Sequence, residues 1–256
     1  MTTGSLGSNE STFTVFRRAV TAEWTRLWTL RSTWYSLLAA AGLMLFVGGA
    51  AGIGHTGTDP APIWEPAQIA IVPGQFAFLL VVLLAVTGEY STGAIRSTLQ
   101  WVPRRGILLV ARTLVPVAFV TVCAVVVSAA TGLVAWAFVG ESAEVVAGDI
   151  VTSLGRIGLV VAFGGLLTAG IALTLRSTAG TLTVIFLLMF VLVVALGNSG
   201  VSWLTAISEH LPGRAIVVIV ADQGALSTKT IATVMVGWSA AALSAGGWSL
   251  IRRDAT

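Results

Sequence analysis

The stretch VTGEYSTGAIRSTLQWVPRR, residues 86–105, interrupts a long apolar run with one carboxylate, two glycines and three arginines. Its middle part predicts a short helix, because Ser91 or Thr92 can cap it and its apolar residues fall one turn apart. Pro103 ends this helix, and Arg96 projects from a face other than the apolar one. Such a helix is either a docking element for another protein or a plain surface loop.

Few other residues could do chemistry alone. A P-loop needs Gly-Lys followed by Ser or Thr, but the single lysine, Lys229, follows Thr228, so no ATPase site of that type is present. Ser199 and His210 could be a nucleophile and its base, although the sequence NSG around Ser199 is also a simple helix stop. His55 has no second ligand at metal-binding spacing. We therefore expect no catalytic residues, no metal and no cofactor in this chain, and no nucleic-acid partner.

The composition indicates a membrane protein. Of 256 residues, 56% are hydrophobic and 10% are charged, and the mean hydropathy is +0.93, whereas a soluble domain has about 25% charged residues. A helix needs about 20 apolar residues to cross about 30 Å of hydrocarbon. The stretches long enough to do so lie at about residues 34–54, 69–87, 107–139, 156–175, 181–196 and 230–251.

A long segment, about residues 198–229, separates the fifth of these spans from the sixth. Its apolar piece AIVVIVA, residues 215–221, has only seven residues and cannot cross the bilayer. We expect it to be partly buried or re-entrant, because irregular backbone at membrane depth must be covered by protein.

The positions of the basic residues indicate the orientation, since Arg and Lys beside spans stay in the cytoplasm. Eleven cations fall on one side and three on the other, so both termini are predicted to be cytoplasmic. Arginine makes up 13 of the 14 basic residues, which indicates a GC-rich genome and hence a bacterial plasma membrane. The eleven are Arg17, Arg18, Arg26, Arg31, Arg96, Arg104, Arg105, Arg112, Arg176, Arg252 and Arg253; the other three are Arg156, which we place near an end of the fourth span, Arg214 and Lys229.

We expect residues 1–31 to carry no cleavable signal and to form an amphipathic helix. Phe13, Phe16, Val20 and Trp24 recur at helical spacing, and arginines lie elsewhere around the helix. Tryptophan and arginine together suit the headgroup region, so we expect the helix to lie in the cytoplasmic interface. The alternative is a soluble amphipathic helix packed on a partner.

These features resemble the membrane permeases of type 2 ABC exporters, in particular the short six-span form of actinobacteria. The resemblance covers essentially the whole chain and is carried by TAEWTRLWTLRSTW at residues 21–34, by GEYSTGAIRSTL and PRR after the second span, and by the long outer segment. It implies an all-α polytopic fold with a cytoplasmic connecting helix over residues 1–31 and a single six-span domain over residues 32–256. Short re-entrant helices are expected within residues 198–229.

The resemblance also implies how the protein works. In that family the segment after the second span, here about residues 89–105, is a coupling helix that sits in a groove of a separate ATPase subunit. ATP and Mg are bound by that subunit, and two identical or related permeases assemble with two ATPases. Such a transporter would export a drug, an antibiotic or a lipid-like molecule. The resemblance assigns ATPase coupling to Glu89, Thr92, Gly93, Arg96 and Arg105, and the connecting helix to Glu23, Trp24, Arg26 and Arg31; it assigns no substrate-binding residue.

Two other kinds of function stay open on the residues alone. The chain could be a non-transporting membrane subunit that anchors a partner or senses a ligand through its outer segment, and an intramembrane enzyme is a more distant reading. Small residues at four-residue steps, as in Gly48 with Gly52 and Gly237 with Ala241, let helices approach closely. They could serve packing within the chain or a contact between two copies.

Overall fold

The computed structural model describes residues 12–54, 61–62, 64–92, 105–139, 143–144, 147–221 and 228–253. These residues form helices and their connecting turns, together with two strands of two residues, β1 (Ala61–Pro62) and β2 (Ala143–Glu144), which pair in parallel. The helical elements are α1 (Thr12–Thr29), α2 (Arg31–Gly54), α3 (Glu65–Thr92), α5 (Arg105–Val139), α6 (Ala147–Leu175), α7 (Thr178–Phe186), η2 (Leu187–Val191), α8 (Leu192–Gly197), α9 (Ser202–Glu209), α10 (Pro212–Ala221) and α11 (Thr228–Arg253).

Within this described part, six helical segments are long and apolar enough to cross a membrane. They agree with the six predicted spans, and they indicate a multi-pass membrane protein. The segments are Arg31–Gly54, Glu65–Gly88, Leu109–Phe138, Gly148–Leu175, Thr178–Gly197 and Lys229–Ser249.

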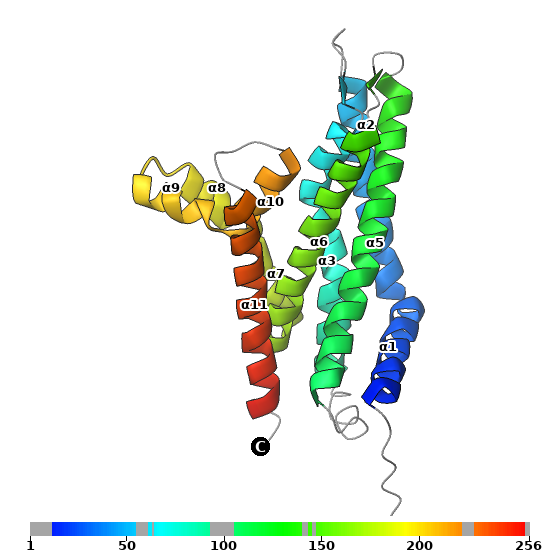
Figure 1. Ribbon diagram of the computed structural model, residues 1–256, viewed down its shortest axis with the longest axis vertical. Helices are drawn as coiled ribbons and strands as arrows, with labels where there is room; N and C mark the ends of the chain where they lie inside the picture. The colour runs from blue at the N-terminus through cyan, green and yellow to red at the C-terminus, as the bar shows by residue number, and fades with distance from the viewer. Residues whose placement is uncertain are drawn as a thin grey trace, which may run out of the picture.

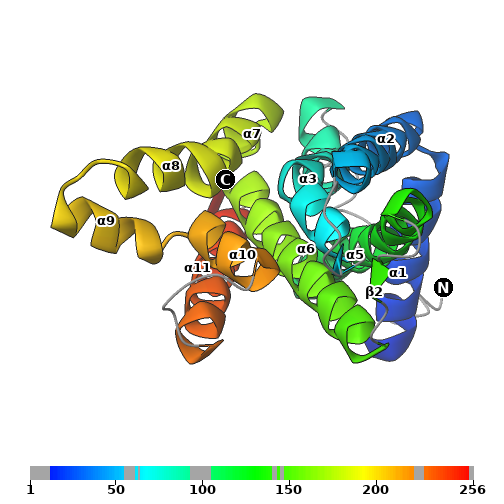
Figure 2. The same ribbon diagram turned by 90° about the horizontal axis from the view of Figure 1, so that it is seen from above.

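Helices α3 and α6 form the centre of the molecule. In Figures 1 and 2, α2, α3, α5 and α6 pack together as a bundle, and α11 packs against α6. The most apolar windows of α3 and α6 are 61% and 67% buried, the highest values among the six spans. Their apolar residues therefore form the core, and Phe78 and Val82 of α3 with Ile157 and Val161 of α6 are fully buried.

One predicted boundary is wrong. The fourth span was expected to begin at Arg156, but α6 begins at Ala147. Arg156 therefore lies within the helix and is half-buried, rather than near its end. The first turns of α6 contain polar residues, so a search for apolar stretches does not detect where the helix starts. Asp149 is nevertheless favourable in the first turn, because the N-terminal end of a helix attracts negative charge.

The fifth span differs from the others in shape and in packing. It is made of α7, the π-helix η2 and α8, and only 17% of its most apolar window is buried. Figure 2 shows α8 and α9 extending away from the bundle. The N-terminal end of α10 approaches η2 so closely that a side chain at Gly213 would collide with the backbone of Met189.

The predicted outer segment, residues 198–229, contains α9 and α10, of eight and ten residues. Neither is long enough to cross a bilayer, which agrees with the expectation for residues 215–221. Ala215 and Ile216 of α10 are buried. Re-entry of this segment into the membrane stays a prediction.

Glycines set the closest helix crossings. Gly48 and Gly52 of α2 pack against Thr131 and Ala135 of α5, so this predicted small-residue pair serves packing within the chain. At Gly237 of α11, no described atom other than those of its chain neighbours and of its own helix backbone lies within 4 Å of where a side chain would begin. The sequence reading missed Gly170 of α6 and Gly246 of α11, which let these two helices touch through their backbones.

We expect Gly246→Val to destabilise the protein by about 1–3 kcal/mol, the usual cost of overpacking. A Cβ at this position would lie 2.8 Å from the carbonyl oxygen of Gly170, which is backbone and cannot rotate away. Thermal unfolding in detergent, followed by the loss of the monodisperse peak in gel filtration, measures the effect. Gly237→Val is the matched control, because it adds the same side chain to the same helix in open space; equal melting temperatures for the two variants would contradict the packing described.

Candidate functional site

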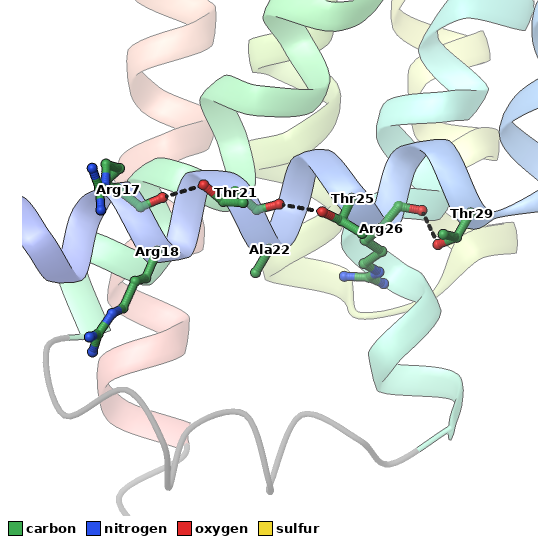
Figure 3. Close-up of a pocket in the computed structure, with 7 residues that line it drawn as sticks. All are labelled: Arg17, Arg18, Thr21, Ala22, Thr25, Arg26 and Thr29. Carbon is green, nitrogen blue, oxygen red and sulfur yellow. Dashed lines mark hydrogen bonds between the residues drawn. The ribbon is translucent and has the colours of Figure 1, made fainter.

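The predicted connecting helix is α1, and it lies along α5 at the end of the bundle where α11 also ends (Figure 1). Its residues divide into three faces because a helix advances 100° per residue. One face is buried against the bundle through Ala19, Glu23 and Leu27. A second face carries aromatic side chains, and the third, drawn in Figure 3, carries arginines and threonines.

The aromatic face joins α1 to its neighbours. The rings of Trp24 and Trp28 lie 5.7 Å and 6.1 Å from that of Phe119 in α5, measured between centroids. Trp34 of α2 lies 5.0 Å from Trp28, and its Nε1 donates a hydrogen bond of 3.1 Å to the Trp28 carbonyl. Since only Leu30 separates α1 from α2, these contacts fix the angle between the two helices.

The buried face of α1 places Glu23 and its neighbour Arg26 close to the end of α3. Glu23 is 6% exposed, and its Oε2 lies 3.6 Å from Nη1 of Arg26. Arg26 also reaches α3, because a Cβ placed on Gly88 would lie 3.4 Å from Nη2 of Arg26. The connecting helix therefore touches α3 one residue before the predicted coupling segment begins at Glu89.

A second arginine binds the backbone of α3 two residues before Gly88. Arg112 of α5 is only 2% exposed, and its Nη2 donates a hydrogen bond of 3.2 Å to the carbonyl of Val86. Thr87 shares a hydrogen bond of 2.8 Å with Thr178 of α7. We call the contacts of Arg26, Arg112 and Thr87 with their partners the α3 joint.

The role of Arg112 was missed by the sequence reading, which counted it only among the cytoplasmic cations. A signal was present, because the predicted third span begins at residue 107 and so contains this arginine. A charge inside a span is expected to bind a partner in the protein interior. The identity of that partner, a backbone carbonyl 26 residues earlier, follows only from the packing of α5 on α3.

The other predicted coupling residues lie at or beyond the joint. Glu89 and Thr92 belong to the last turn of α3, and Arg105 is the first residue of α5. Gly93 and Arg96 lie outside the described residues, as does most of the predicted helix at residues 89–105.

Three of the four predicted connecting-helix residues lie in α1, and the fourth lies at the start of α2. Glu23, Trp24 and Arg26 all lie in α1 and contact the body, whereas Arg31 is exposed and begins α2.

The two residues considered as a catalytic pair have structural partners. Ser199 Oγ donates a hydrogen bond of 2.8 Å to the carbonyl of Leu196, and Nδ1 of His210 lies 3.0 Å from the carbonyl of Ala206. Each side chain thus binds the helix that precedes it, which favours the interpretation of NSG as a helix stop.

The contacts of the α3 joint can transmit movement between helices. It joins α1, α5 and α7 to residues 86–88 of α3, one turn before α3 ends at Thr92 and residues 93–104 lead to α5. A load applied to that connection would act on α3 and α5 together, because Arg112 of α5 is bonded to Val86 of α3. No protein-family model and no curated protein sequence matches the chain.

Proposed function

We propose that the chain is the membrane permease subunit of an ATP-binding-cassette exporter. It would move a substrate, such as a drug, an antibiotic or a lipid-like molecule, across a bacterial plasma membrane with energy from a separate ATPase subunit. The observation that carries the proposal is the α3 joint: Arg112 donates a hydrogen bond to Val86 and Arg26 lies beside Gly88, directly before the segment that resembles a coupling helix. A plain surface loop has no need of such anchoring.

The proposed mechanism follows the packing. The ATPase moves residues 89–105, and the movement passes into α3 and α5 together because Arg112 links them. Helix α1 moves with them, since it packs on α5 and contacts Gly88. The movement then reaches the buried centre of the molecule along α3.

Helix α3 has a natural point of bending in its first half, at Pro73. Pro73 has no backbone N–H and so leaves one helical hydrogen bond unmade. The next residue, Gly74, has no side chain, and the space is taken by Met44 of α2. In this proposal the part of α3 beyond Pro73 moves with the joint while the part before it stays packed.

Both termini are proposed to lie in the cytoplasm, on the same side as the joint. In a background in which Cys123 is replaced by alanine, a cysteine at Thr2 or Ala255 is expected to resist a membrane-impermeant maleimide added to intact cells. A cysteine at Thr58, in the predicted first outer loop, should be labelled, because positively charged flanks hold the termini inside. Labelling of either terminus from outside would overturn the topology, and lysed cells provide the control for reactivity.

Co-expression tests the proposed function. The chain is expressed with candidate P-loop ATPases from the same genome, and the purified complex is assayed for ATP hydrolysis in lipid vesicles. Stable copurification with ATP turnover that depends on the permease is expected. An ATPase that neither copurifies nor changes its turnover would contradict the proposal.

A membrane anchor or sensor subunit is the second candidate. It is favoured by α9, which extends from the bundle and exposes Trp203 and Ile207. Such a subunit could bind an ATPase as well, but its ATP turnover would not respond to any transported compound. Screening amphipathic compounds for stimulation of turnover therefore separates the two candidates.

A further inference from the structure

The third face of α1 forms a shallow groove that shares only Arg26 with the α3 joint (Figure 3). Its volume is about 700 Å³. Arg17 and Arg18 line one end, Arg26 lines the other, and Thr21, Thr25 and Thr29 line the wall between them.

The groove suits an anion. Among the described residues that line it, there are arginines but no carboxylate. The nearest acid on α1, Glu23, is buried on another face and lies beside Arg26. Arg17 and Arg18 are both exposed there, and each guanidinium group can donate parallel hydrogen bonds to the oxygens of a phosphate.

The threonines form the uncharged wall of the groove. The hydroxyls of Thr21 and Thr25 donate hydrogen bonds of 3.0 Å and 2.9 Å to carbonyls one turn earlier in α1. The hydroxyl of Thr29 does the same over 3.1 Å. Because these hydroxyls satisfy their own helix, the wall is small and uncharged, and binding strength comes from the arginines.

The surroundings of the groove indicate where the anion comes from. Helix α1 leads into the membrane-spanning α2 with only Leu30 between them. Trp24 and Trp28, on the adjacent face of α1, are 45% and 46% exposed, and tryptophan with such exposure beside a span is typical of the headgroup level. Arg17 lies seven residues from Trp24, about 10 Å along the helix, so the basic end of the groove is close to that level.

We propose that this groove binds the phosphate of anionic phospholipids in the leaflet beside α1. The lipid holds α1 in the interface while the buried face of α1 holds the α3 joint. The site depends only on the membrane location of the chain. It does not depend on the identity of the ATPase or of the transported substrate.

The test uses the full chain purified in detergent and titrated with phosphatidylglycerol or phosphatidylcholine, with bound lipid counted by native mass spectrometry. Phosphatidylglycerol should bind more tightly than phosphatidylcholine. The double variant Arg17→Gln, Arg18→Gln should weaken phosphatidylglycerol binding by about 25-fold, at about fivefold for each arginine near an anionic surface. Both side chains are exposed, so the variant should melt at the parent temperature.

The matched control is Arg252→Gln, Arg253→Gln, which removes the same charge at the end of α11 on the same predicted side. This control should keep the phosphatidylglycerol preference. Equal losses in the two double variants would overturn the groove and leave only a general attraction to positive charge. Equal binding of the two lipids by the parent protein would overturn the proposal as well.

Two further experiments test whether the groove binds free phosphate or a protein instead of a lipid. Inorganic phosphate at millimolar concentration should not displace the lipid, and full displacement would assign the groove to free phosphate. If the Arg17 and Arg18 variant loses the copurifying ATPase while its lipid binding stays unchanged, the groove is a protein-docking site and the lipid proposal is wrong.

Discussion

Replacement of Arg112 by methionine is expected to uncouple the protein from its ATPase while leaving it inserted in the membrane. Arg112 is buried and donates to the carbonyl of Val86, and a hydrogen bond from a charged group contributes about 1.5–3 kcal/mol. Methionine fills a similar volume but has no donor. The end of α3 should then move independently of α5, and permease-dependent ATP turnover should fall by about tenfold or more.

Arg176→Met is the matched control for this prediction. Nη2 of Arg176 also donates over 3.2 Å to a backbone carbonyl, that of Ser249 near the end of α11. The two variants thus remove the same bond at different helix ends. If both lower the melting temperature but only Arg112→Met loses turnover, the α3 joint is the coupling element; equal loss of turnover would mean that the effect is one of stability alone.

Reversal of charge at Arg96 is expected to have an effect at least as large, because it acts on the docking surface directly. Arg96→Glu should weaken association with the ATPase, since a like charge at an interface opposes encounter and a buried charged pair contributes several kcal/mol. Insertion should be unchanged, because ten of the eleven predicted cytoplasmic cations remain. Copurification and ATP turnover, measured at equal amounts of inserted protein, report the effect.

Arg253→Glu supplies the control for Arg96, because it makes the same reversal on the same predicted side but at the end of α11. It should keep the ATPase bound. Replacement of residues 91–99 by Gly and Ser tests the whole segment and should abolish turnover. Full coupling in that replacement would move the assignment toward the anchoring subunit.

The spans were predictable because length and apolarity decide whether a helix can cross a membrane. The start of α6 was not, because Asp149 and the other polar residues of its first turns interrupt the apolar signal. The π-helix η2 was also missed. It forms where Met189 meets Gly213 of α10, and a contact between residues far apart in the chain leaves no local pattern.

The candidate site was predictable only in its outline. The aromatic and basic pattern of α1 predicted an amphipathic helix, and the resemblance selected Glu23 and Arg26. Neither indicated that Glu23 would be buried or that Arg26 would reach Gly88. In the same way, the spacing of Gly48 and Gly52 predicted a close helix contact, but only the structure shows that the partner is α5. Gly170 and Gly246 lie on different helices, so no sequence spacing predicts their contact.

The central claim is that the segment after α3 docks on an ATPase, and a photo-crosslink from residue 96 tests it most directly. A photoreactive amino acid replaces Arg96 in the full chain, cells are irradiated, and the covalent adduct is identified by mass spectrometry, so the partner need not be known beforehand. The same amino acid at Trp203 of α9, on the predicted outer side, is the control. The proposed function predicts an adduct with a P-loop ATPase from position 96 and none from position 203. An absence of any ATPase adduct at position 96, or an equal yield at position 203, would contradict it.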